Sequence, residues 1–294
     1  MSKILLTGAS GFLGRHLALG LPANITSLGR GETNDVVCDL SKDVPEVSAV
    51  DIVVHAAGKA HLVIKTESEE QEFYNVNSRG TQNLLEALSL NPPQHFVFIS
   101  TVAVYGCENG KLISETHPLE GSTPYAVSKI NAEGMVRDWG EKYDVPCLIL
   151  RLPLIAGPNP PGNLGKMIAG IRKGRYPSIG GGQARRSVVL AEDVAYCIQN
   201  NFQKSGTFNL TDGYHPSFRE IERCIVTQLG KPMPRRIPLG LARLMGRVGD
   251  LLPGASLSSA IISKMTQDLT FDDSKARKEL QWNPRRVIDH FQIE

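Results

Sequence analysis

The segment "PYAVSK" places a tyrosine and a lysine, Tyr125 and Lys129, four residues apart. In a helix these two side chains lie on the same face, one turn from each other. A lysine ammonium about 4 Å from a phenol favours the phenolate by roughly 4 kcal/mol, or ~3 pK units, at an effective dielectric constant of about 20. The pKa of the tyrosine would then lie near neutrality, where general acid–base catalysis works best. Such a spacing also arises by chance, so the rest of the chain decides between a catalytic pair and two surface residues.

A glycine pattern near the N-terminus provides a second chemical signal. The segment "LLTGASGFLGRHL" carries Gly8, Gly11 and Gly14 between a short apolar run and the first helical pattern. Glycines in this context permit a tight turn and let backbone N–H groups and the helix dipole approach a pyrophosphate. The pattern therefore predicts a dinucleotide-binding loop.

The residues after the second apolar run indicate which dinucleotide is bound. NAD-specific folds usually place an acid there, which binds the ribose hydroxyls. In "NITSLGRGE" this place holds Gly29 followed by Arg30, and Arg15 could assist. A cation without a carboxylate suits a 2′-phosphate better than a 2′-hydroxyl. The sequence thus favours NADP(H) as the cofactor, with NAD(H) as the alternative.

Short β-rich apolar runs alternate along the chain with longer helical patterns. The apolar runs cover residues 4–6, 25–28, 36–37, 52–55, 96–100 and 148–150, and the helical patterns cover residues 12–21, 75–90 and 125–142. Alternation without hairpin signals predicts an α/β fold, a Rossmann-type doubly wound parallel sheet covered by helices on both faces. Gly/Pro-rich loops follow. We expect a nucleotide-binding core over residues 1–155 and a smaller C-terminal substrate-binding domain over residues 156–294, with some segments returning to the core sheet.

Composition argues against several other classes of protein. The chain has 294 residues, of which 41% are hydrophobic and 21% charged, and its formal net charge of +2 argues against a nucleic-acid partner. Its five cysteines are scattered without a C-x-x-C pair, which favours reduced thiols over disulfides or a metal site. The chain enters an apolar run directly, with no room for a signal peptide, and its apolar stretches are shorter than a membrane span. We expect a cytoplasmic protein.

The segment "LGLARLMGRVGDLL", at residues 239–252, is basic and amphipathic. Such a helix can lie on a membrane surface. Its few arginines fall short of a polybasic anchor, so we expect it to pack on the smaller domain instead.

The glycine loop and the Tyr-x-x-x-Lys pair together resemble the extended short-chain dehydrogenase/reductase family, the group of nucleotide-sugar epimerases, dehydratases and reductases. The resemblance covers nearly the whole chain. It runs, in order, through "GASGFLG", "CDL", "HAAG", "NVNSRGTQNLLEA", "FVFISTVAVYG", "TPYAVSK" and "RLPLIAGP". Because these motifs occur together and at sensible spacing, the resemblance implies that the tyrosine and the lysine are catalytic.

The resemblance also implies roles for individual residues. Thr101 rather than its neighbour Ser100 aligns with the catalytic hydroxyl, so the catalytic residues are Thr101, Tyr125 and Lys129. Lys129 would also hold the nicotinamide ribose, and Asp39 would contact the adenine amino group. The implied cofactor-binding residues are Gly8, Gly11, Phe12, Leu13, Gly14, Arg30, Asp39, Leu40, Ala56, Ala57, Gly58, Asn77, Tyr125, Lys129 and Pro153. A homodimer is expected through the helices at residues 75–90 and 125–142.

At the substrate end, the stretch from "PPGNLG" to "EDVA" resembles the nucleotide-diphosphate pocket of the family. The resemblance implies that Thr101, Asn163 and Arg186 contact the substrate, since an arginine fork suits a diphosphate. Asp193, seven residues after Arg186, is expected to be structural. The implied partner is a nucleotide sugar, with uridine diphosphate favoured by its frequency in the family.

The residues after Thr101 narrow the reaction. In sugar 4,6-dehydratases of the family an Asp-Glu pair follows the catalytic threonine, whereas this chain has Val102 and Ala103, which transfer no proton. The favoured reaction is reduction of a 4-keto-6-deoxy sugar nucleotide for surface polysaccharide synthesis. The alternative is a nucleotide-sugar 4-epimerase that keeps NAD bound. A non-catalytic NADP-binding scaffold is a remote third possibility, because such proteins typically lose the tyrosine or the lysine.

Overall fold

A seven-stranded parallel sheet forms the centre of the computed structural model, which describes residues 2–21, 24–60, 66–251 and 258–294. The strands lie in the order β11-β7-β5-β4-β1-β2-β3, and each neighbouring pair is parallel. Their bounds are β1 (Ile4–Thr7), β2 (Ile25–Gly29), β3 (Val36–Val37), β4 (Ile52–His55), β5 (His95–Thr101), β7 (Cys147–Leu152) and β11 (Gly206–Asn209). The Rossmann-type doubly wound sheet expected from the sequence is confirmed.

The order of the strands reverses at β1, which pairs with β2 on one side and with β4 on the other. At such a switch point the loops after two neighbouring strands diverge, and they leave a crevice at the carboxyl ends of the strands. The loops concerned follow Thr7 in β1 and His55 in β4. This edge of the sheet is therefore where a ligand site is expected.

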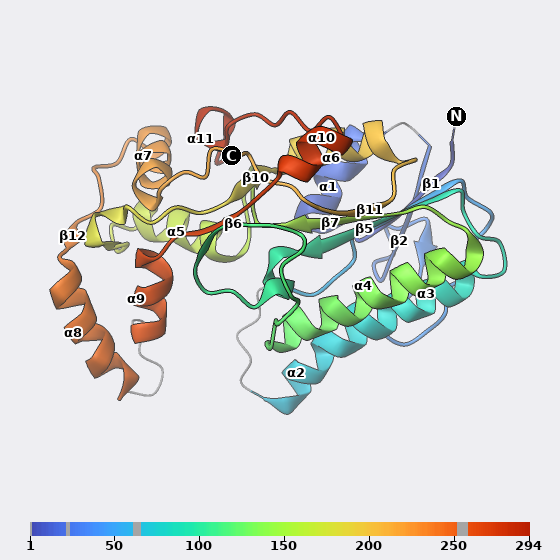
Figure 1. Ribbon diagram of the computed structural model, residues 1–294, viewed down its shortest axis with the longest axis horizontal. Helices are drawn as coiled ribbons and strands as arrows, with labels where there is room; N and C mark the ends of the chain where they lie inside the picture. The colour runs from blue at the N-terminus through green and yellow to red at the C-terminus, as the bar shows by residue number, and fades with distance from the viewer. Residues whose placement is uncertain (1, 22–23, 61–65, 252–257) are drawn as a thin grey trace.

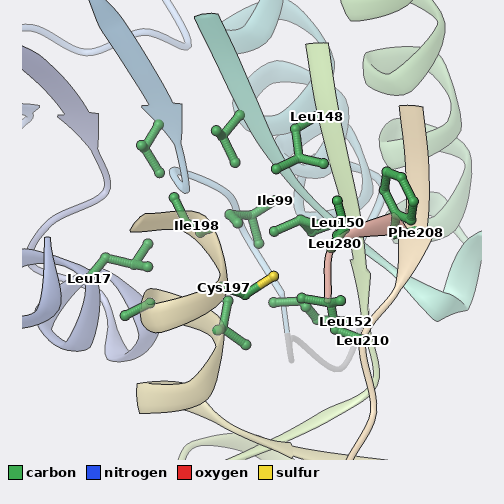
Figure 2. Packing of buried hydrophobic residues seen from close by; sticks show 14 of the residues in the cluster. Leu17, Ile99, Leu148, Leu150, Leu152, Cys197, Ile198, Phe208, Leu210 and Leu280 are labelled. Atoms are coloured by element: carbon green, nitrogen blue, oxygen red, sulfur yellow. The ribbon is translucent and has the colours of Figure 1, made fainter. Parts of the chain in front are cut away.

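Helices cover both faces of the sheet (Figure 1). One face carries α1 (Phe12–Gly20), α6 (Ala191–Asn201) and α10 (Ser274–Glu279), and the other carries α3 (Gly80–Leu88) and α4 (Pro124–Tyr143). Figure 2 shows the core on the first face, where Leu17 of α1, Ile198 of α6 and Leu280, directly after α10, lie in one cluster with Leu148 and other strand residues. Because both faces are buried, the strands read as nearly unbroken apolar runs.

A π-helical turn, which is wider than an α-helical turn, interrupts the helical stretch that precedes strand β5. Between α2 (Glu67–Phe73) and α3 lies η1 (Tyr74–Arg79), a six-residue segment with π-helical hydrogen bonding. Such segments are rare and often occur at functional sites. This one contains Asn77, a predicted cofactor-binding residue.

A smaller part lies beside the sheet and consists of β6 and much of the chain after β7. It is built on three two-stranded pairs, β8 with β10, β9 with β12 and β6 with β13. These strands are β6 (Gly110–Ile113), β8 (Leu154–Ala156), β9 (Ser178–Ile179), β10 (Val188–Leu190), β12 (Arg236–Ile237) and β13 (Leu269–Phe271). The remaining helices are η2 (Val102–Tyr105), α5 (Gly162–Arg172), η3 (Gly180–Gly182), α7 (Phe218–Leu229), α8 (Leu239–Asp250), α9 (Ser259–Thr266) and α11 (Val287–His290). Since α6 and β11 return to the core, the division at residue 155 stays a prediction.

The amphipathic helix α8 packs on α9 through its small residues. Its buried residues are Ala242 and Gly246, whereas Leu244 and Val248 stay 60% and 52% exposed. As expected, this segment packs on the smaller part of the protein, but small residues occupy the packing face and the large apolar side chains stay exposed. Residue 252, at its end, lies outside the described residues. Within the described part of the chain, no helix is both long and apolar enough to cross a membrane.

Candidate active site

The residues predicted to do chemistry converge on one cavity at the carboxyl ends of β1, β4, β5 and β7. Its volume is about 320 Å³. The predicted residues that line it are Gly8, Gly11, Phe12, Leu13, Gly14, Ala56, Gly58, Thr101, Tyr125, Lys129 and Pro153. Four larger cavities lie elsewhere in the described part of the chain, and none of them is lined by a predicted catalytic residue. The structure thus brings the glycine loop and the three predicted catalytic residues to the switch point of the sheet.

Close backbone approach explains the glycines of the loop between β1 and α1. Gly8 has a φ of +73°, and a Cβ atom there would lie 2.6 Å from the backbone nitrogen of Ala57. A Cβ atom on Gly14 would lie 1.9 Å from the carbonyl oxygen of Gly8. The N-terminus of α1 begins after Gly11 without a side-chain cap, so its first N–H groups are free to bind an anion. The loop therefore fits the pyrophosphate of a dinucleotide.

The adenosine end of the predicted cofactor site lies beyond β2. Arg30 follows this strand and is exposed. Burial acts to raise the pKa of the Asp39 carboxyl, but hydrogen bonds from Ser41 and the cations Lys42 and Arg30 outweigh it, and the pKa is lowered. Arg30 and Asp39 are thus close enough to interact electrostatically. This proximity is what we expect of two residues that bind the same adenosine. Leu40 is buried, and its carbonyl oxygen accepts a hydrogen bond of 2.8 Å from the side-chain amide of Asn83.

Thr101, Tyr125 and Lys129 come together from the end of β5 and the first turns of α4. The Thr101 hydroxyl accepts a hydrogen bond from the backbone of Ala103 at 3.2 Å, and Thr101 lies close enough to the Tyr125 phenol to act on its pKa. The Lys129 ammonium donates to the carbonyl oxygen of Ile99 at 2.8 Å and lies 4.4 Å from the centre of the Phe98 ring. The spacing seen in the sequence therefore corresponds to one face of a helix that closes the cavity.

The pKa values of the pair differ from the sequence-based expectation. Burial lowers the pKa of Lys129 to about 8, against an opposing effect of Glu133. Burial also raises the pKa of Tyr125, against an opposing hydrogen bond with Thr101. The expectation that Lys129 brings the pKa of the tyrosine close to neutrality is wrong in this structure, because desolvation of the buried phenol is the largest effect and raises its pKa. At neutral pH Tyr125 is a protonated phenol and can donate its proton.

A buried ionic network behind Lys129 was not predicted from the sequence. Glu133, one turn further along α4, is fully buried and accepts hydrogen bonds from Ser100 at 2.6 Å and from Arg151 at 2.7 Å and 3.0 Å. Arg137 reaches the same carboxylate at 2.6 Å. Two signals could have revealed this network. Glu133 follows Lys129 at helical spacing, and Arg151 is a charge inside an otherwise apolar strand, which requires a partner.

Asn77 holds the loop after β4 against α4. Its amide accepts a hydrogen bond from the backbone nitrogen of Lys59 at 2.7 Å, and it donates to the Lys59 carbonyl oxygen at 3.1 Å and to Ser128 at 2.9 Å. Both N–H donors of the amide are thus used within the protein. Ala57 is fixed in the same loop by a 3.0 Å hydrogen bond from its backbone nitrogen to Thr7. Asn77 positions the wall of the cofactor cavity from behind it.

Of the predicted substrate residues, Thr101 lines the cavity, whereas Asn163 and Arg186 lie outside its wall. Asn163 is exposed in the first turn of α5. Arg186 donates to the backbone carbonyl oxygens of Gln267, at 2.5 Å, and of Lys264, at the end of α9. Its role as a diphosphate ligand stays a prediction, since in this structure the guanidinium binds the main chain. Asp193 pairs with Arg285 at 2.6 Å, in keeping with the structural role expected for it.

The model of the NAD dependent epimerase/dehydratase family matches residues 4–210, which contain the whole cavity wall and the three predicted catalytic residues. The chain belongs to this family. The resemblance to the extended short-chain dehydrogenases/reductases is thereby confirmed, and the chain is an enzyme of that type that acts with a nicotinamide dinucleotide.

Members of the epimerase/dehydratase family with named activities match over almost the full chain. A UDP-glucose 4-epimerase from Vibrio cholerae is 26% identical, over 97% of this chain and 92% of its own. A dTDP-glucose 4,6-dehydratase from Neisseria meningitidis is 30% identical, over 98% of this chain and 90% of its own. The crystal structure of a UDP-N-acetylglucosamine 4-epimerase from Bacillus cereus superposes with a TM-score of 0.75 at 22% identity, covering 98% of this chain and 95% of that one. The last similarity establishes the fold.

The lowered pKa of Lys129 predicts how stability depends on pH. Because the pKa is about 8 in the folded chain and 10.5 in the unfolded one, the unfolded chain holds the proton more tightly. Lys129 therefore costs stability below pH 8, and this cost is relieved as the pH rises towards 10.5. Urea unfolding of wild type and Lys129→Met should give a stability difference that shifts in favour of wild type by roughly 2–3 kcal/mol between pH 7 and pH 10. A pH-independent difference would contradict the burial of a charged lysine.

Proposed function

We propose that the protein reduces the 4-keto group of a 4-keto-6-deoxy sugar nucleotide, UDP-linked by preference, with NADPH as the hydride donor. One observation carries this proposal. Among the described residues that line the cavity, Tyr125 is an acid that stays protonated at neutral pH, and none is Asp or Glu. The site can donate a proton to an oxygen, but it offers no carboxylate for elimination.

The chain's own residues account for the proton side of such a reduction. The nicotinamide, when bound, supplies hydride to the carbonyl carbon. Thr101 and Tyr125 line the same cavity, so one carbonyl oxygen bound there can contact both hydroxyls, and Tyr125 gives it the proton that completes the hydroxyl. Lys129 lies one turn along α4 and stabilises the phenolate that is left. A proton from solvent then restores Tyr125.

We do not propose dehydratase activity, despite the similarity to a dTDP-glucose 4,6-dehydratase. In the sugar 4,6-dehydratases of the family, elimination across C5 and C6 depends on an Asp-Glu pair after the catalytic threonine. Here Val102 and Ala103 form the start of η2, and Val102 packs into an apolar cluster with Val104 and Phe271. Neither side chain can take or give a proton.

A 4-epimerase is the second candidate, favoured by the Vibrio cholerae relative. An epimerase oxidises and reduces the same carbon, so Tyr125 would have to act first as a base. Its raised pKa opposes that first step. Arg30, which suits a 2′-phosphate, also favours the NADPH that a reductase consumes over NAD held through each turnover.

The product of such a reductase would serve surface polysaccharide synthesis, and the nucleotide diphosphate would extend from the cavity towards Asn163 and Arg186. Engagement of Arg186 would require its guanidinium to exchange the carbonyl oxygens of Gln267 and Lys264 for phosphate oxygens. The homodimer proposed through the segments 75–90 and 125–142 would pair the helices α3 and α4, which lie side by side in Figure 1.

The reaction is tested by supplying both kinds of substrate. A preformed UDP-4-keto-6-deoxy sugar mixed with NADPH should oxidise one NADPH per molecule reduced, followed by absorbance of the reduced nicotinamide. UDP-glucose or UDP-N-acetylglucosamine with catalytic NAD should give no C4 epimer, and dTDP-glucose no 4-keto-6-deoxy product, when the sugars are resolved. Rapid appearance of the epimer, with no oxidation of NADPH by the keto sugar, would establish the epimerase instead.

Cofactor preference is tested at Arg30. Wild type should bind NADPH more tightly than NADH, and Arg30→Ala should narrow this gap by about 1–3 kcal/mol, the scale of a charge-assisted hydrogen bond to the 2′-phosphate. Nicotinamide fluorescence titrations measure both affinities. Arg79→Ala, outside the cavity wall, serves as the control and should leave the gap unchanged. Equal affinities for the two cofactors in wild type would contradict the preference.

A further inference from the structure

The exposed side chains of α8 form an apolar stripe on the surface of the protein. The stripe consists of Leu241, Leu244, Met245, Val248 and Leu251, which recur at spacings of three and four residues and so share one side of the helix. Their exposed fractions run from 42% at Met245 to 82% at Leu251. Soluble proteins seldom leave a contiguous stripe of large apolar side chains uncovered, and such stripes mark sites of interaction.

The stripe faces outward because other residues of α8 face the protein. Ala242 is fully buried, and a Cβ atom on Gly246 would lie 2.5 Å from the side chain of Ile262 on α9. With Ile179, Ala242 and Ile262 form a small core beneath the helix. These small residues let α8 approach α9 closely along a different side of the helix from the stripe. The stripe is therefore not the side of α8 that packs against the core of the protein.

The unit made of α8 and α9 is attached firmly to the rest of the protein. Strand β12, just before α8, pairs with β9, and Arg186 binds the carbonyl oxygens at the end of α9. In Figure 1 the two helices lie together at one extremity of the molecule. The stripe thus belongs to a unit at the periphery of the molecule.

Positive charge borders the stripe. Residues 231–251 contain five lysines and arginines and one acid, Asp250, which gives this segment a net charge of +4 in a chain whose total is +2. Arg243 and Arg247 lie one turn apart beside the stripe and are exposed, and neither forms an ion pair with any residue that the structure describes. The surface therefore combines apolar side chains with free cations.

We propose that α8 docks the protein on an anionic lipid surface. The stripe would enter the boundary between headgroups and acyl chains, and Arg243 and Arg247 would lie against lipid phosphates. A second copy of the chain fits less well, since a symmetric contact brings the same patch from both copies together and opposes their positive charges. A lipid interface also accepts an outward helix of flexible aliphatic side chains without a shaped pocket. This docking is independent of the proposed reaction.

Co-sedimentation of the full chain with phosphatidylcholine vesicles, with and without phosphatidylglycerol, tests the proposal. Wild type should bind the phosphatidylglycerol vesicles and lose affinity as salt is added. Arg243→Gln/Arg247→Gln should lower the partition coefficient about 25-fold, at about fivefold for each cation. Leu244→Gln/Val248→Gln should lower it by about tenfold or more, because two apolar side chains no longer enter the interface.

Matched controls separate the stripe from general surface effects. Leu19→Gln/Leu112→Gln changes two side chains that are 87% and 57% exposed elsewhere, and Lys204→Gln/Lys278→Gln removes two exposed cations outside α8. The apolar control should bind like wild type, and the cation control should stay within a fewfold of it. Circular dichroism checks that every variant is folded. Absence of binding to anionic vesicles, or equal binding by the α8 variants, overturns the proposal. So does a change in oligomeric state of the Leu244/Val248 variant without vesicle binding by wild type, which would identify a second copy as the occupant.

Discussion

The burial of Lys129 is the constraint around which the active site is organised. Its side chain is 5% exposed, and its ammonium is held by the carbonyl oxygen of Ile99 and the face of the Phe98 ring. An ammonium taken out of water costs several kcal/mol unless it is compensated. Glu133 supplies the opposing charge one turn along the same helix, and Arg151 holds that carboxylate in place. The catalytic helix α4 is thereby tied to the strands β5 and β7.

Burial also affects the rest of the cavity wall. It raises the pKa of Tyr125 and so keeps the phenol protonated, which suits donation of a proton to a carbonyl oxygen. The loop after β4 is packed closely against Lys129. A Cβ atom on Gly58 would lie 3.4 Å from the Lys129 ammonium and 3.2 Å from the Asn77 amide oxygen. The π-helical turn that carries Asn77 brings this amide to the loop, so the widened turn, the glycine and the lysine form one arrangement.

Sequence reasoning recovered what depends on local pattern. The apolar runs correspond to the parallel strands of the sheet. The glycine loop, Tyr125 and Lys129 line one cavity, because strand order and helical periodicity place them there. It missed β11, a four-residue strand whose place depends on pairing with β7. It also missed the raised pKa of Tyr125, since desolvation depends on packing from distant segments. The placement of Arg186 against α9 and the outward stripe of α8 likewise depend on which helices pack together, and no short motif encodes that.

The central claim is that Tyr125 donates the proton while hydride reaches the carbonyl carbon. Single-turnover oxidation of NADPH by Tyr125→Phe, on a 4-keto-6-deoxy UDP-sugar, tests it most directly when paired with a fluorescence titration of NADPH. Removing one oxygen should slow turnover by several orders of magnitude and leave NADPH affinity nearly unchanged. A variant that retains a tenth of the wild-type rate would contradict the assignment of Tyr125 as the proton donor.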